Sequence, residues 1–306
     1  MRLLLIVNTS ASSVTARGRV VIHKALAADH DVTMAETSRR GHATRLAQGA
    51  AANGMDAVVV LGGDGTLNEA ANGLAGSATA LGVLPGGSTN VFARTIGLIN
   101  DPIEATGQLL GGLATPTIRR IGLGSINGRY FLFHVGVGFD AAVVAQVERH
   151  SGLKRWAGHP LFVYAGFDTW FRHYDRTTPG FSVEFADGSK IADGYLAICL
   201  NTNPYTFLGN RPLNLGLGTG FDTALTLTTF RSLDFGTVLG VVAAAAWRPR
   251  RLERFKHVHR RRDLDKFVLR GLRPVPYQVD GDHLGDAETF VFRYEREVLN
   301  LVVPTA

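Results

Sequence analysis

The sequence predicts two domains: an α/β N-terminal domain with a parallel sheet flanked by helices, and an antiparallel β-sandwich C-terminal domain. Three observations lead to this fold class. Up to Thr115, apolar strand-like runs alternate with helical patterns, which is typical of a parallel sheet covered by helices. After Thr115, Asn-Gly and Asp-Gly pairs separate strand-like runs, which indicates hairpins. The chain has 306 residues, more than a single core usually organises.

The first half contains regularly alternating elements. The expected strands cover Leu3–Val7, Val32–Ala35, Ala57–Leu61 and Ala80–Leu84, and the expected helices cover Thr15–Ala28, Gly41–Asn53 and Leu67–Gly73. A further helix is predicted at "DPIE", where Asp101 is a suitable N-cap and Pro102 a suitable first helical residue. We place the domains at residues 1–118 and 119–306, and leave open whether the last strand returns to the first domain.

The second half shows hairpin signals. Asn127-Gly128 and Asp187-Gly188 each stand between two strand-like runs, because Asn, Asp and Gly tolerate the positive φ angles of tight turns. The segment from Phe139 to about Trp170 has a helical pattern and interrupts these strands.

The cysteine content and the longest apolar run indicate the cellular compartment of the protein. The single cysteine, Cys199, lies in the apolar run "YLAICLN" and is expected to be an inert core thiol. The longest apolar run, Phe235–Trp247, is 13 residues and too short to span a bilayer. We therefore expect a cytoplasmic protein that is not integral to the membrane.

The basic charge is concentrated in one segment. Residues Arg248–Arg262 hold seven arginines, one lysine and one glutamate, a local net charge of +7, whereas the whole chain carries +6. This segment predicts peripheral contact with an anionic membrane surface, because each cation near such a surface contributes about 1 kcal/mol. A solvated loop is the plainer interpretation, and nucleic-acid binding is the least favoured one.

Two glycine-rich loops follow successive strands. "LGGDGTLNEA" ends a strand and opens a helix, for which Thr66 and Glu69 are expected to form a capping box. "LPGGSTN" follows the next strand in the same manner, with a helix expected to open at Ser88 or Thr89. Glycines leave backbone amides uncovered and a helix N-terminus favours anions, so both loops predict phosphate binding at the carboxyl edge of the sheet. Asp64 would repel phosphates unless a cation intervenes, which indicates Mg²⁺ and phosphoryl transfer from a nucleotide.

At this point the sequence resembles the diacylglycerol kinase catalytic domain family, which includes bacterial lipid kinases and sphingosine kinases and is remotely similar to NAD kinases. "GGDGTLNE" followed by "PGGSTNVFAR" carries the resemblance, and "VNTSAS", "ETSRRGHATRLA", "HVGVGFDA" and "YQVDGDHLG" support it. The resemblance implies two domains that meet at an active cleft. It further implies a kinase that transfers the γ-phosphate of ATP to the hydroxyl of a diacylglycerol-like lipid.

The resemblance also assigns roles to individual residues. It implies that Asp282, where the family has glutamate, accepts the proton of the acceptor hydroxyl, with Asp64 organising the metal. It implies that Asp222 retains part of a second Mg²⁺ site. The residues expected to bind ATP are Asn8, Thr37, Gly62, Gly63, Asp64, Gly65, Thr66, Asn68, Gly86, Gly87, Ser88, Thr89 and Asn90.

Two alternatives stay open from the sequence. The acceptor could be soluble, such as NAD, in which case phosphorylation needs no lipid. The chain could also bind nucleotide without catalysis, as Val91 and Gly122 suggest, since family members often carry aspartate at both positions. Edge strands in the second domain leave homodimer formation open.

Overall fold

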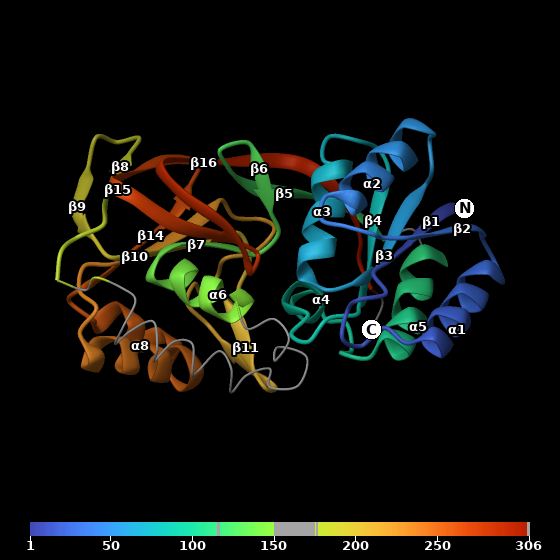
Figure 1. Cartoon of the computed structure of the whole chain (residues 1–306), viewed down its shortest axis with the longest axis horizontal. Coiled ribbons are helices and arrows are strands. Elements are labelled where there is room, and N and C mark those ends of the chain that lie inside the picture. The colour runs from blue at the N-terminus through green and yellow to red at the C-terminus, as the bar shows by residue number, and fades with distance from the viewer. Residues whose placement is uncertain (115–116, 150–174, 176, 305–306) are drawn as a thin grey trace. The chain divides into compact units, whose positions relative to one another are not determined.

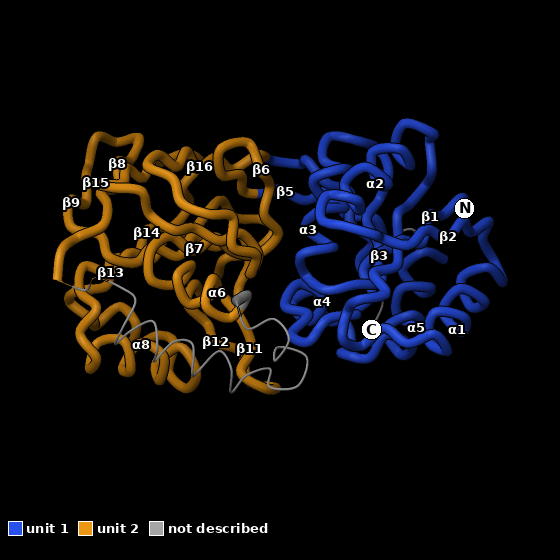
Figure 2. Tube along the Cα trace, in the orientation of Figure 1, with its two compact units in different colours: residues 1–123, 296–306 blue, residues 124–295 orange. Residues whose placement is uncertain are grey.

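The computed structural model describes residues 1–114, 117–149, 175 and 177–304 (Figure 1). The chain divides into two compact units, unit 1 with residues 1–123 and 296–306, and unit 2 with residues 124–295 (Figure 2). The predicted division at residue 118 falls on the first residue of β5 (Ile118–Ile126), a strand that runs from unit 1 into unit 2. The last strand, β16 (Asp282–Val302), runs back from unit 2 into unit 1.

Unit 1 is built on a parallel sheet with the strand order β4-β3-β1-β2. The strands are β1 (Arg2–Val7), β2 (Asp31–Glu36), β3 (Ala57–Gly62) and β4 (Ala80–Pro85). β3 and β4 are buried along their whole length, as expected for parallel strands covered on both faces. The end of β16 extends this sheet, because Asn300 and Leu301 pair in parallel with Ala80 and Leu81 of β4.

Helices cover both faces of this sheet. They are α1 (Ala16–Ala27), α2 (His42–Ala52), α3 (Asp64–Leu74), α4 (Val91–Thr95) and α5 (Pro102–Ala114). α2 packs on α3, and α1 packs on α5 (Figure 1). Gly73 permits the first contact, since a Cβ there would lie 2.5 Å from the Thr44 carbonyl oxygen. Two sequence signals for helix starts are confirmed: Thr15 accepts a hydrogen bond from the Gly18 amide, and Asp101 accepts from the Ile103 and Glu104 amides.

Unit 2 is an antiparallel β unit, which confirms the predicted fold class. Its remaining strands are β6 (Arg129–Phe131), β7 (His134–Gly138), β8 (Phe181–Phe185), β9 (Lys190–Gly194), β10 (Leu196–Leu200), β11 (Thr206–Leu208), β12 (Arg211–Leu213), β13 (Leu225–Phe230), β14 (Val258–Leu264) and β15 (Lys266–Val279). The main sheet follows the order β14-β13-β10-β7-β15, with every neighbouring pair antiparallel. Its helical elements are α6 (Phe139–Arg149), α8 (Phe235–Trp247) and the 3₁₀ helix η2 (Pro249–Arg254).

Strand β10 lies at the centre of unit 2 and is buried on both faces. Ala197 and Cys199 point into a core shared with β7, β8, β13, β15 and β16. Leu196, Ile198 and Leu200 point to the opposite face, where α8 and η2 cover them. Cys199 is buried, and burial raises the pKa of its thiol well above the ordinary value, which agrees with an inert core cysteine.

The two predicted hairpins are present. Asn127 and Gly128, at φ 49° and 85°, connect β5 and β6. At the second, Gly188 alone has positive φ, at 81°, so the turn between β8 and β9 is a three-residue loop rather than a primed two-residue turn. The predicted helix from Phe139 is observed as α6 up to Arg149; the part expected at residues 150–170 lies outside the described residues.

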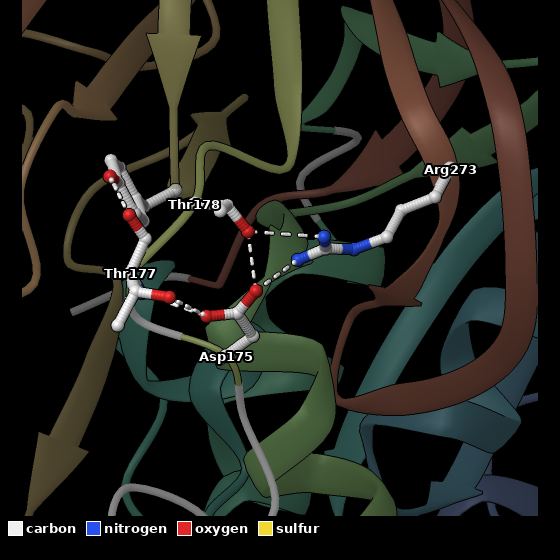
Figure 3. A network of polar contacts seen from close by, with 5 residues as sticks. Asp175, Thr177, Thr178 and Arg273 are labelled. Atoms are coloured by element: carbon white, nitrogen blue, oxygen red, sulfur yellow. Dashed lines mark hydrogen bonds and ion pairs between the residues drawn. The ribbon is translucent and has the colours of Figure 1, made fainter.

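A surface network ties the segment before β8 to β15 (Figure 3). The carboxylate of Asp175 accepts hydrogen bonds from the Thr177 amide and hydroxyl and from the Thr178 hydroxyl. It also forms an ion pair of 3.3 Å with Arg273. The hydrogen bonds from Thr178 and Thr177 hold the pKa of Asp175 below its ordinary value. All four residues are on the surface, so we assign this network a fastening role.

Among the described helices, none has both the length and the apolar character that a membrane span needs.

Candidate active-site residues

The two glycine loops lie against each other at the carboxyl edge of the unit 1 sheet. Gly62 and Pro85 are register partners at the ends of β3 and β4, and the Gly86 amide donates to the Gly62 carbonyl at 2.8 Å. A Cβ on Gly86 would lie 2.8 Å from the Gly62 nitrogen, and one on Gly87 would lie 2.8 Å from the Gly63 Cα. Backbone is thus packed on backbone, and only glycine fits this contact.

Helix α3 begins at the first loop without a side-chain cap. It starts at Asp64 with Gly63 as N-cap, three residues earlier than the capping-box interpretation requires. Gly63, Asp64 and Gly65 are partly exposed. An uncapped helix N-terminus on a glycine loop presents amide donors and about half a positive charge to an anion. This geometry fits a phosphate group.

The predicted capping box of Thr66 and Glu69 is wrong. The Thr66 hydroxyl accepts a hydrogen bond from the Asn8 side-chain amide at 2.8 Å. The Glu69 carboxylate reaches another helix and accepts from the Gly41 and Ala43 amides, at 2.6 and 3.1 Å. Glu69 therefore caps the start of α2, whose N-cap Gly41 has no side chain to do so. Because α3 starts at Asp64, Glu69 lies too far into the helix to reach back to its own N-terminus.

Asp64 joins the first loop to the helix after the second. Its carboxylate accepts hydrogen bonds from the Val91 and Phe92 amides, at 3.0 and 3.1 Å, and so caps the short helix α4. Sequence reasoning assigned Asp64 to ATP and Mg²⁺ and did not predict this cap. A carboxylate has about four acceptor positions, and the Val91 and Phe92 amides occupy two of those of Asp64.

The second loop is held rigid by Asn90. Its side chain accepts from the Gly87 amide at 2.8 Å and donates to the Gly87 carbonyl at 2.9 Å and to Asn100 at 2.7 Å. Asn90 itself adopts φ 51°, a conformation that asparagine tolerates. Between Gly87 and Asn90, Ser88 is exposed and Thr89 is half-buried. Helix α4 begins at Val91, later than predicted.

The other predicted nucleotide residues of unit 1 differ in exposure. Asn8, directly after β1, is half-buried and bonds to Thr66 of α3. Thr37 follows β2, and its amide donates to the Val7 carbonyl at 2.9 Å beside Asn8. Asn68 is buried within α3, where its side-chain oxygen accepts from Asn72 at 3.2 Å. The structure thus brings Asn8, Thr66 and the two loops together, whereas Asn68 is turned into the interior.

In unit 2, Asp282 directly follows a hairpin turn. Asp280 and Gly281 form a two-residue loop between β15 and β16, with φ of 48° and 82°, and Val279 pairs with Asp282. Asp282 is half-buried and stands at the start of β16. "VDGD" thus forms a β-hairpin turn, and the predicted role of Asp282 in catalysis stays a prediction.

The turn is fixed by Asp280, a residue to which the sequence analysis gives no role. Its buried carboxylate accepts from three successive amides, Leu132, Phe133 and His134, at 2.7, 3.0 and 3.0 Å. These bonds interrupt the strand expected through "RYFLFHV" and divide it into β6 and β7. The side-chain oxygen of Gln278 accepts a hydrogen bond from the Gly281 amide at 2.8 Å. The loop before Asp282 is thus held at both of its residues.

Gln278, next to this turn, belongs to a partly buried polar network. Asp140, in the first turn of α6, accepts hydrogen bonds from the Gln278 side-chain amide at 2.7 Å and from the Tyr205 hydroxyl. Burial raises the pKa of Asp140, while the two donors oppose that rise. Burial, and then the nearby Asp140, raise the pKa of Tyr205 well above its ordinary value. Only the "HVGVGFDA" resemblance pointed to this region, because the partners are distant in sequence.

His134 makes unit 2 sensitive to acid. It is buried beside Tyr205, with ring centroids 4.5 Å apart, and burial lowers its pKa to about 3. In the unfolded chain, His134 binds a proton near pH 6.5, whereas in the folded chain it does so only near the lowered pKa. The stability that depends on neutral His134 is therefore fully present above pH 6.5 and is lost as the pH falls below that value. The raised pKa of Asp140 has the opposite effect on stability, because its contribution increases as the pH decreases.

We therefore expect His134→Phe to reduce the pH dependence of unfolding. The difference in unfolding free energy between wild type and variant should shrink by about 1 kcal/mol per pH unit from pH 6 to pH 4. Urea unfolding at several pH values measures it. Asp140 is present in both proteins, so its titration cancels, and a constant difference would contradict the assignment.

The predicted metal residues lie in different units. Asp64 belongs to unit 1, and Asp222 lies on an exposed turn of unit 2 before β13. Within the part of the chain that the structure describes, no group of three or more histidine, cysteine, aspartate or glutamate side chains could hold a metal ion. Asp64 alone fits a Mg²⁺ ion that arrives with phosphates, since Mg²⁺ commonly binds one or two carboxylates plus substrate phosphates.

Comparison with known proteins agrees with this geometry. Residues 2–127 match the family model of the diacylglycerol kinase catalytic domain. The chain is 38% identical to the diacylglycerol kinase of Bacillus subtilis (strain 168) over 151 residues, 48% of each chain. It is 31% identical over 191 residues to a protein of Chromohalobacter salexigens named as a YegS-like lipid kinase, covering 58% of this chain and 60% of that one. The matched part spans about half of these relatives.

The fold extends beyond the matched sequence. A crystal structure of a diacylglycerol kinase from Bacillus anthracis str. Sterne superimposes with a TM-score of 0.73 at 19% identity, covering 99% of this chain and 96% of that one. At this identity the likeness shows the fold alone. The sequence motifs, the glycine loops and the family match agree over the same residues. Through residues 2–127, the chain is therefore similar to the diacylglycerol kinase catalytic domain family.

Proposed function

We propose that this protein is an ATP- and Mg²⁺-dependent lipid kinase that phosphorylates the hydroxyl of a diacylglycerol-like lipid. The observation that carries the proposal is the backbone contact between the Gly62–Gly63 and Gly86–Gly87 loops beside the uncapped start of α3. Phosphoryl transfer needs little covalent chemistry from the protein and depends on positioning and charge neutralisation. Rigid amide donors at a helix N-terminus supply both.

The reaction assigns a step to each unit. The loops of unit 1 would bind the polyphosphate of ATP, and Asp64 would hold Mg²⁺, which neutralises the phosphate charge when bound. Asp282 of unit 2 would accept the proton of the lipid hydroxyl. The hydroxyl oxygen then bonds to the γ-phosphorus, the bond from this phosphorus to the bridging oxygen breaks, and ADP leaves. A phosphorylated lipid is the second product.

The direct test is incubation with ATP labelled at the γ-phosphate and vesicles that contain diacylglycerol, followed by separation of the products. Label in a lipid that migrates as a phosphatidic acid is the expected result. Label transferred to NAD without lipid would favour the soluble-acceptor alternative. Bound ATP with no transfer to any lipid of a total extract would favour a catalytically inactive nucleotide-binding protein.

Mg²⁺ dependence is a separate prediction. We expect ATP to bind at least tenfold more tightly with Mg²⁺ than with EDTA, and Asp64→Asn to lose most of that difference. Calorimetric titration measures both, and thermal unfolding reports the cost of weakening the α4 cap. Equal Mg²⁺ dependence in wild type and Asp64→Asn would remove Asp64 from the metal site.

A lipid acceptor also requires contact with a bilayer. We propose peripheral association with an anionic surface through the segment Arg248–Arg262, where five of the seven arginines are exposed. Homodimer formation is a further proposal, and the molar mass in solution tests it.

A further inference from the structure

Helix α8 presents an apolar face that the described residues of unit 2 do not bury. Val241, Ala244 and Ala245 pack into the core under the sheet. Across the helix, Phe235, Leu239, Val242 and Trp247 are 51%, 56%, 43% and 63% exposed. The 13 residues contain no charged side chain. A helix that is apolar on every side is usually buried, so this exposed face indicates a partner.

The 3₁₀ helix η2 sets a row of arginines beside this face. Residues three apart eclipse each other in a 3₁₀ helix, so Arg251 and Arg254 share one side of η2, and together with Arg248, which directly precedes η2, they form an arginine edge. This arginine edge lines a groove of about 470 Å³, together with Ala243 and Trp247 of α8 and with Phe255. Apolar walls and guanidinium groups thus meet along one groove.

Of the four other arginines of the basic segment, Arg260, Arg261 and Arg262 are paired with carboxylates, whereas Arg250 of η2 has no ion pair among the described residues. Arg260 and Arg262 lie 3.7 and 3.1 Å from the Glu253 carboxylate. Arg261 forms an ion pair of 2.6 Å with Asp187 and stacks 4.2 Å over the Phe185 ring. For the arginine edge, no ion pair is found with any residue that the structure describes. The charge that looks continuous in the sequence is therefore divided in two, and only the η2 part adjoins the apolar face.

We propose that α8 and the arginine edge of η2 form the surface by which unit 2 lies on an anionic phospholipid bilayer. The exposed side chains of α8 enter the boundary between headgroups and acyl chains, and Arg248, Arg251 and Arg254 contact lipid phosphates. This arrangement is that of an interfacial helix, apolar on one side and cationic along its border. The inference rests on the proposed function, because a lipid kinase meets its acceptor at a bilayer.

Charge favours a bilayer over a second copy of the chain. A twofold contact buries the same patch of both copies, so it would bring two arginine edges into one apolar interface. Buried guanidinium groups need acidic partners. The arginine edge has no ion pair among the described residues of one copy, so a second copy would bring the same arginines and no carboxylate to pair with them. Anionic headgroups provide phosphates directly beside an apolar layer.

The test is co-sedimentation with vesicles of phosphatidylglycerol and phosphatidylcholine, without ATP. Arg248→Gln/Arg251→Gln/Arg254→Gln should lower the partition coefficient on the order of 100-fold, about fivefold per cation. Leu239→Asn should lower it at least fivefold. The matched control, Arg231→Gln/Arg270→Gln/Arg273→Gln, removes the same charge from arginines of unit 2 that are ion-paired and lie outside the basic segment, and it should stay within fivefold of wild type. Pure phosphatidylcholine should bind at least tenfold more weakly.

Three outcomes would overturn the inference. Equal losses in both triple variants would show a response to net charge alone. Wild-type binding by Leu239→Asn would exclude insertion of α8. A wild-type dimer that Leu239→Asn converts to monomer would show that a second copy covers the face. Transfer of phosphate to detergent-dispersed diacylglycerol without vesicle binding contradicts the docking alone, whereas vesicle binding without transfer contradicts the kinase proposal alone.

Discussion

Asp282→Asn is expected to lower the rate of phosphate transfer to lipid by about 10²–10⁴-fold, the usual contribution of a general base. The substitution removes the proton acceptor and preserves the size of the side chain. Affinity for ATP should stay within about twofold, because the predicted phosphate loops belong to unit 1 and Asp282 to unit 2. Initial rates with labelled ATP and a titration of ATP binding measure the two effects.

The matched control is Asp286→Asn, which removes the same charge from an exposed residue of the same strand. We expect its transfer rate to match that of wild type within about threefold. Retained turnover in Asp282→Asn would remove this carboxylate from the mechanism. Equal loss in both variants would show that the rate responds to charge on β16 rather than to a base.

Gly86→Ala is expected to weaken ATP binding by about 10–100-fold. The new methyl group would lie 2.8 Å from the Gly62 nitrogen and 2.9 Å from the Gly62 Cα, both backbone atoms of the neighbouring loop. Relief of such overpacking typically costs about 1–3 kcal/mol and would separate the two loops. Calorimetric titration with ATP gives the affinity, and thermal unfolding separates loss of binding from loss of fold.

Gly107→Ala provides the control in the same unit. A Cβ at Gly107, inside helix α5, meets nothing within 4 Å, so the same added methyl group should leave ATP binding unchanged. Alanine should also stabilise this helix by about 0.5–1 kcal/mol. ATP binding by Gly86→Ala at wild-type affinity would mean that the contact between the loops is unrelated to the nucleotide.

The elements of the fold were predictable where the signal is local. Thr15 and Asp101 cap helices because their side chains reach amides two or three residues away, and Asn127-Gly128 turns the chain within four residues. The buried strands β3 and β4 read directly as apolar runs. In each case the residues that decide the structure are neighbours in sequence.

Contacts between distant residues were not predictable in this way. Glu69 has the spacing of a capping-box partner for Thr66, yet it caps a helix that begins 27 residues earlier in the chain, because α2 and α3 pack side by side. Asp280 divides a strand that is about 150 residues away. No local pattern distinguishes a carboxylate that binds its own turn from one that binds a remote one.

The candidate site shows the same division. Its glycine loops were found from composition and from their position after strands, and their contact follows from the pairing of β3 with β4. The bond from Asp64 to α4 and the network of Asp140, Tyr205 and Gln278 were missed, since each joins segments that only the fold brings together. The division of the basic segment by Glu253 and Asp187 was missed for the same reason.

The central claim is that the two glycine loops of unit 1 hold the phosphates of a nucleotide. Amide hydrogen exchange with ATP, AMP and adenosine tests it most directly, because backbone donors are the proposed ligands. If the loops bind the phosphates, amide exchange over residues 62–68 and 86–90 will be slower with ATP and Mg²⁺, less affected by AMP and unaffected by adenosine. Binding of ATP that leaves exchange in both loops unchanged, or adenosine that protects them equally, would contradict it.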